Sequence, residues 1–231
     1  MEVKGARMIP FSGLPFLFSA MGVLMLILAG YLEGLIGYNP GIIPIILFLL
    51  SSGTSVEVRN NELLLHYGFG KLAVRIGLED IRELTLLNRL ERGVIMRYFK
   101  GEAFIVLILL VCAIFDMVLM KGEGIGWEVY GDVLAMIFLT PYFLLLMLPF
   151  RSRWITYSVG FICAGLALIL PMMFHDAAYL FWGPFWTAVV IFMLREFYSK
   201  DYVLLKTEKG MYLIATDDGS ASLSTIRGEI S

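Results

Sequence analysis

The sequence predicts an integral membrane bundle of about six helices joined to a small antiparallel β domain. Three observations support this fold class: long uncharged apolar stretches, Lys and Arg residues collected on one side of them, and period-two alternation in two polar segments. Hydrophobic residues make up 59% of the 231 residues and charged residues 16%. With a mean hydropathy of +0.81, this composition excludes an ordinary soluble domain.

Six stretches are each close to the length of a membrane-crossing helix. A hydrocarbon core about 30 Å thick requires about 20 residues of helix at 1.5 Å per residue. Asp116 is the one charged residue within the stretches. Pro40 and Pro44 interrupt the second stretch, so it is expected to be short, kinked or re-entrant. The stretches are 8–32, 34–56, 103–120, 133–150, 154–174 and 177–194.

The distribution of positive charge predicts the orientation of these stretches. If the N-terminus is cytoplasmic and all six cross, every Lys and Arg except Lys121 lies on the cytoplasmic side. Positive residues are retained on the cytoplasmic side of membrane proteins. The sequence therefore predicts a multi-pass protein of the plasma membrane with both termini in the cytoplasm.

Two polar segments show the alternation of half-buried strands. In the first, strands are expected at 56–59, 62–67, 72–76, 81–87 and 94–99, with Asn60-Asn61 and Gly68-Phe69-Gly70 as turns. The second is a hairpin formed by 202–207 and 211–216. A lone hairpin is marginal in water, and an even number of crossings separates the two segments. We therefore expect them to pair into one seven-stranded cytoplasmic domain.

Four regions follow from these assignments. Residues 1–53 hold the first two membrane segments and 54–101 the first cytoplasmic strands. Residues 102–196 form a four-span bundle. Residues 197–231 form the hairpin and tail that complete the β domain.

The strand segments carry a family resemblance. Residues 56–68 (VEVRNNELLLHYG) followed by 76–84 (IGLEDIREL) resemble the opening of bacterial pleckstrin-homology-like domains on small membrane proteins, and 202–214 (YVLLKTEKGMYLI) looks like their last two strands. Such domains end in a helix, for which this chain has at most the short tail 220–229. The resemblance implies an interaction module with no catalytic residues.

A basic surface against the inner leaflet is one candidate site. Each Lys or Arg close to anionic lipid contributes about 1 kcal/mol. Acidic residues are interleaved with the basic ones, so the alternative is that they only satisfy the positive-inside rule. The candidate contacts are Arg75, Arg89, Arg92, Arg97, Lys100, Arg151 and Arg153, with Lys71 and Arg82 on the same segment.

Signals for catalysis, cofactors and metals are absent from the sequence. There is no phosphate-binding glycine loop, nucleophile elbow or pair of metal-spaced His or Cys residues. His175-Asp176 is expected to be an interfacial turn, and Cys112 and Cys163 are expected to be packing residues. We therefore predict a protein that is not an enzyme, with no cofactor and no metal.

Asp116 is the one ionisable residue well inside an apolar stretch. Such residues usually serve transport or proton relay, which makes Asp116 a candidate intramembrane polar site. The alternative is that Asp116 pairs with nearby Lys121 at the headgroup layer. The leading prediction is a non-enzymatic membrane protein whose β domain binds a protein, a lipid or a second copy of the chain, and not nucleic acid. A small transporter or channel with a regulatory cytoplasmic domain is the alternative.

Overall fold

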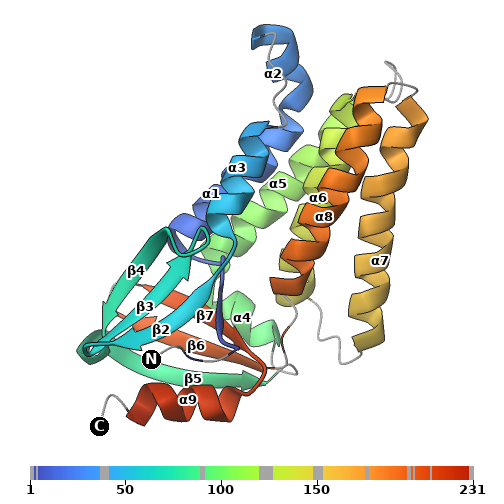
Figure 1. Ribbon diagram of the computed structural model, residues 1–231. Helices are drawn as coiled ribbons and strands as arrows, with labels where there is room; N and C mark the ends of the chain where they lie inside the picture. The colour runs from blue at the N-terminus through green and yellow to red at the C-terminus, as the bar shows by residue number, and fades with distance from the viewer. Residues whose placement is uncertain are drawn as a thin grey trace.

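The computed structural model describes residues 3, 5–36, 42–88, 92–119, 127–147, 153–174, 177–196, 199, 201–208 and 210–228. A strand-rich domain lies at one end of an elongated set of helices (Figure 1). The helices are α1 (Gly13–Ile27), α2 (Ala29–Ile36), α3 (Ile42–Ser51), α4 (Arg92–Tyr98), α5 (Lys100–Leu119), α6 (Trp127–Met147), α7 (Arg153–Ile169), α8 (Ala177–Glu196) and α9 (Gly219–Gly228). The strands are β1 (Arg7–Ile9), β2 (Ser55–Arg59), β3 (Glu62–Tyr67), β4 (Leu72–Gly77), β5 (Ile81–Asn88), β6 (Asp201–Thr207) and β7 (Met211–Thr216).

The prediction of about six membrane spans is wrong. Among the described residues, α5 is the one helix long and apolar enough to cross a membrane, with 20 residues and a mean hydropathy of 2.7. Shorter apolar helical segments lie at Gly13–Ile27, Ile42–Ser51, Tyr157–Met173 and Phe181–Leu194 of the described residues. At 1.5 Å per residue, α1 reaches about 22 Å and α3 about 15 Å, against the roughly 30 Å of a hydrocarbon core.

Local breaks explain why long apolar stretches do not become long helices. The first stretch divides into β1, α1 and α2, with the helix broken at Leu28. In the fifth stretch, α7 gives way at Leu170 to a 3₁₀ turn. The last stretch lies within one helix, α8, which has Pro184 inside it. Apolar composition therefore persists across these breaks, and composition alone could not locate them.

The strands form two sheets instead of one seven-stranded sheet. A three-stranded antiparallel meander has the order β2-β3-β4, and a four-stranded sheet has the order β1-β7-β6-β5. The expected pairing between the two distant segments is present, because β5 pairs with β6 from Ile81 opposite Thr207 to Asn88 opposite Asp201. The seventh strand is β1, and Met8 lies opposite Ile214 of β7.

The expected strand at 94–99 is helical. Ile95 and Phe99 are both buried, whereas Met96 and Arg97 between them are exposed. Residues four apart lie on the same face of a helix, so this burial pattern fits a helix and not a strand. In a run of six residues, the sequence pattern cannot distinguish the two-residue period of a strand from the 3.6-residue period of a helix.

The four-stranded sheet is a middle layer with both faces buried. Val203 and Leu205 of β6 pack with the three-stranded sheet, while Tyr202 and Leu204 pack with helical residues. On β7, Ile214 likewise packs with the three-stranded sheet and Leu213 with helical residues. Successive strand residues point to opposite faces, so strands covered on both faces carry continuous apolar runs. This explains why the hairpin is apolar at consecutive positions.

The β3–β4 turn joins the strand-rich domain to the helices. The N–H groups of Gly68 and Phe69 donate to the carbonyl of Ser52 just beyond α3, at 2.7 and 3.3 Å. The Phe69 ring stacks on Phe192 of α8 with a centroid distance of 5.7 Å. Gly53 permits this contact, because a Cβ at that position would lie 2.7 Å from the Phe69 ring.

The helical core is centred on α6. Phe138 of α6 stacks on Phe48 of α3 at 4.2 Å between ring centroids, and Trp186 of α8 packs edge-on against both. Tyr142, one turn further along α6, donates to the carbonyl of Pro10 at 3.1 Å. Helix α6 thus links the helical core to the chain that leaves β1.

Candidate functional site

The predicted basic surface is only partly described, and the described members do not form one patch. Arg75 is exposed on β4, whereas Arg97 and Lys100 are exposed where α4 meets α5. These two places lie in different parts of the molecule (Figure 1). The remaining predicted contacts cannot be placed with them: Arg89 and Arg151 lie outside the described residues, and Arg92 and Arg153 are described as helical backbone only.

A groove lies between β5 and α9 on the strand-rich domain. Its volume is about 820 Å³. Leucine side chains supply its apolar part, and hydroxyl groups lie among them. The lining residues are Leu84, Thr85, Leu86, Ser220, Leu223, Ser224 and Gly228.

Strand β5 is the end strand of its sheet. Its one strand partner in the described part of the chain is β6, so the opposite edge carries backbone groups without a neighbouring strand. Leu86 on this strand is 41% exposed, although the neighbouring Leu87 is buried. A long edge strand beside an apolar groove is a template for pairing with another segment.

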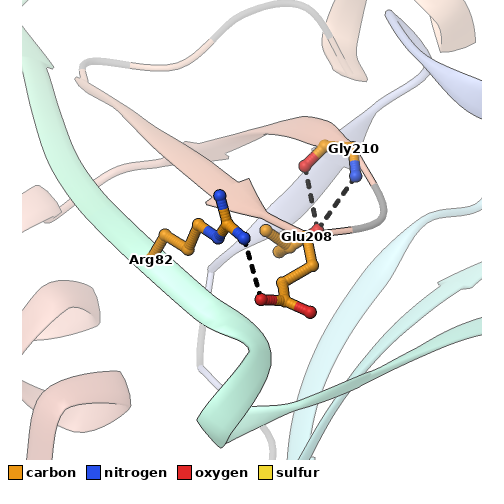
Figure 2. Close-up of polar contacts among 4 residues, drawn as sticks. Arg82, Glu208 and Gly210 are labelled. Atoms are coloured by element: carbon orange, nitrogen blue, oxygen red, sulfur yellow. Dashed lines mark hydrogen bonds and ion pairs between the residues drawn. The ribbon is translucent and has the colours of Figure 1, made fainter.

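The start of β5 is held in place by polar contacts. The pairing with β6 is irregular between Ile81 and Glu83, and Arg82 at this point donates to Glu208 at 2.9 Å (Figure 2). In the same turn, the Thr207 hydroxyl and the carbonyl of Gly210 lie 2.9 Å apart. The Arg82–Glu208 pair thus links the first residues of β5 to the β6–β7 turn, and the strand from Leu84 onward lies beside the groove.

The other wall of the groove is fixed by the start of α9. Asp218 precedes the helix, and its Oδ1 accepts a hydrogen bond from the N–H of Ala221 at 3.0 Å, which caps the helix. Gly219 donates to Asp201 of β6 at 3.2 Å and has no room for a Cβ, because Leu86 occupies that space. Ile226, further along α9, is buried in the core between the two sheets. The groove is therefore preformed.

Asp116 makes a contact that the sequence did not predict. The hydroxyl of Tyr31 on α2 donates to Asp116 Oδ1 at 2.9 Å. The expected alternative, a pair between Asp116 and Lys121, lies outside the described residues. Asp116 is only partly buried.

Asp132 is the polar residue that sequence analysis missed. Asp132 lies just before the apolar stretch predicted at 133–150, but α6 begins at Trp127 and Asp132 is fully buried within it. Neither of its carboxylate oxygens has a hydrogen-bond partner. The signal available in the sequence was the spacing of Glu128 and Asp132, because residues four apart share one face of a helix.

The structure gives no metal site among the residues it describes. No group of three or more His, Cys, Asp or Glu side chains there is arranged to hold an ion. His175 and Asp176, expected to form an interfacial turn, lie outside the described ranges. Cys163 is buried and Cys112 is exposed on α5, so Cys112 is not the packing residue that the sequence predicted.

Comparison with known proteins gives no relative. No family model, no curated protein and no solved structure matches the chain. The resemblance to pleckstrin-homology-like domains therefore remains a prediction.

Proposed function

We propose that the chain is a membrane protein whose strand-rich domain binds an extended segment of a partner protein along the free edge of β5. The groove between β5 and α9 is the observation that carries this proposal. Backbone pairing with β5 would provide affinity. The pockets beside Leu84 and Leu86 would select apolar side chains at alternate positions of the partner.

The edge of β5 suits this role better than the edge of β4. Both are end strands. However, β4 carries the exposed charge of Arg75, and charged side chains protect an edge from pairing. The part of β5 beside the groove carries Leu84, Thr85 and Leu86, which leaves its edge open to an apolar segment.

The membrane part of the proposal rests on α5 and its surface. Apolar side chains are exposed along this helix, including Phe104, Val111 and Phe115. Contiguous exposed apolar surface of this kind is unfavourable in water and typical of a membrane-facing helix. Because β5 and β6 are paired on either side of the segment that contains α5, a crossing by α5 requires a return crossing before β6.

Cys112 provides a direct test of the membrane location. It is exposed near the middle of α5. In lipid, a membrane-impermeant maleimide would not reach this thiol, so we expect no labelling in intact membranes. Ser224→Cys on exposed α9, made with Cys112 and Cys163 replaced by Ala, is the matched positive control and should label from the cytoplasmic side. Labelling of native Cys112 in membranes at the rate of the control would show that α5 lies in water.

A random peptide library displayed on phage tests the groove on the purified full-length chain. We expect selected peptides to carry apolar residues at alternate positions and to protect the amides of Leu84–Leu87 from hydrogen exchange. Leu86→Asp should abolish their binding, because it places a charge in the apolar groove. Arg75→Ala, on the competing edge strand β4, should bind the peptides as the wild-type chain does.

Two results would contradict the groove assignment. One is peptide binding that Leu86→Asp leaves unchanged while its circular dichroism and unfolding remain those of the wild type. The other is failure of selection together with self-association of the chain, which would identify a second copy of the chain as the occupant.

A further inference from the structure

Asp132 is buried without a partner for its charge. Its exposed fraction is 0%, and both carboxylate oxygens lack hydrogen bonds. None of the ion pairs between described residues includes it. An ionised carboxylate in such surroundings is strongly destabilised, and a buried group of this kind takes up a proton instead.

Close approach of helices creates these surroundings. Gly131 lies against α1, where a Cβ would be 2.5 Å from the carbonyl oxygen of Leu26. Gly30 of α2 lies against the side chain of Glu128, which occupies the space where a Cβ of residue 30 would be. The face of α6 that carries Glu128 and Asp132 is therefore pressed against the junction of α1 and α2.

Other acidic and hydroxyl groups face the same place. Tyr31 follows Gly30 on α2 and donates to Asp116 of α5. The charges of Asp116 and Glu128 act on Asp132, and those of Asp116, Glu128 and Asp132 act on Tyr31. Helix α1 contributes backbone at this contact. Three acids and one phenol thus lie around the contact of α6 with α1 and α2, and the charges of Asp116 and Glu128 oppose ionisation of Asp132.

We propose that Asp132 is a proton-binding site, occupied by one exchangeable proton at neutral pH, with Asp116 as the partly exposed acid beside it. The chemistry is a protonation equilibrium: the carboxyl O–H bond breaks to give a carboxylate and a proton, and it re-forms on uptake. Because the ionised form is unfavourable in the closed packing of α6 against α1 and α2, proton release would loosen this contact. The proposal does not depend on the groove between β5 and α9, so either can fail alone.

Infrared spectroscopy of the purified full-length chain tests the site. At about pH 7 an Asp with its ordinary pKa of about 3.9 is ionised and shows no band from a protonated carboxyl. We expect the wild type to show such a carbonyl band, shifted in D₂O because the proton exchanges. Asp132→Asn should remove it, and Glu128→Gln, one turn away on the same face, should leave it in place.

Asp132→Glu guards against misfolding of the Asn variant, because it retains a carboxyl and should move the band instead of abolishing it. The proposal is overturned if the folded wild type shows no band of a protonated carboxyl at about pH 7. It is equally overturned if the band persists in Asp132→Asn, since another acid would then hold the proton.

Discussion

Helices α5 and α6 are neighbours of almost equal length, 20 and 21 residues, yet their surroundings are opposite. Most side chains of α5 are exposed, and its one internal acid, Asp116, bonds to a tyrosine at the surface. Most described side chains of α6 are buried or half-buried, and its internal acid, Asp132, has no partner. The two adjacent helices therefore differ in position: most of α5 lies at the surface of the protein, whereas α6 lies in the helical core.

Apolar composition is therefore shared by α5 and α6 and does not indicate which of the two helices is buried. Helix α5 buries only one face, including Val106, Leu109 and Ala113, and leaves its other apolar side chains exposed. Helix α6 packs against α1, α2, α5 and α8 and against Phe48 of α3. A buried acid on α6 must be neutralised within the protein, while a surface acid on α5 can reach polar surroundings. The two carboxyl groups therefore differ in burial and in hydrogen bonding, although both helices are apolar.

The largest expected effect is the difference in stability lost when a phenylalanine is replaced by alanine on α6 and on α5. Phe138→Ala removes a buried ring that contacts Phe48 and Trp186, and it should lower the free energy of unfolding by about 3–5 kcal/mol. Phe115→Ala on α5 removes a ring that is 62% exposed, and it should change stability by no more than about 0.5 kcal/mol. Denaturant unfolding of the two variants in detergent measures both values. Equal losses would show that α5 is packed in solution as tightly as α6.

Alternation and turn chemistry predicted much of the strand-rich domain. The strands β2, β3 and β4 lie where the period-two pattern placed them, because each has one face in the core between the two sheets. The hairpin β6–β7 was also expected, together with its pairing to the earlier strands. The short tail, which the sequence left as the one segment available for a closing helix, contains α9 from Gly219 to Gly228.

Other elements depend on contacts that the sequence does not state. Strand β1 is three residues long, and it is a strand because β7 offers it an edge. Strand β5 pairs with β6 and not with β4, which produces two sheets. No local sequence pattern indicates which strand another strand will pair with. The site at β5 was missed for the same reason, since the strand was predicted but its free edge was not. Asp132 was left outside the apolar stretch 133–150 because that stretch was bounded by charged residues, whereas α6 begins at Trp127.

A smaller expected effect is the change in stability when a glycine is replaced by alanine, which should have opposite signs on α6 and α5. Gly131→Ala would place a Cβ 2.5 Å from the backbone of Leu26, so α6 must move away from α1 at a cost of about 1–3 kcal/mol. Gly101→Ala near the start of α5 meets no atom within 4 Å, and it should stabilise the helix by about 0.5–1 kcal/mol because Ala restricts the unfolded chain. Thermal unfolding of both variants against the wild type checks the two signs. A stabilised Gly131→Ala would mean that α6 and α1 are not in close contact, and the burial of Asp132 that depends on this contact would have to be abandoned with it.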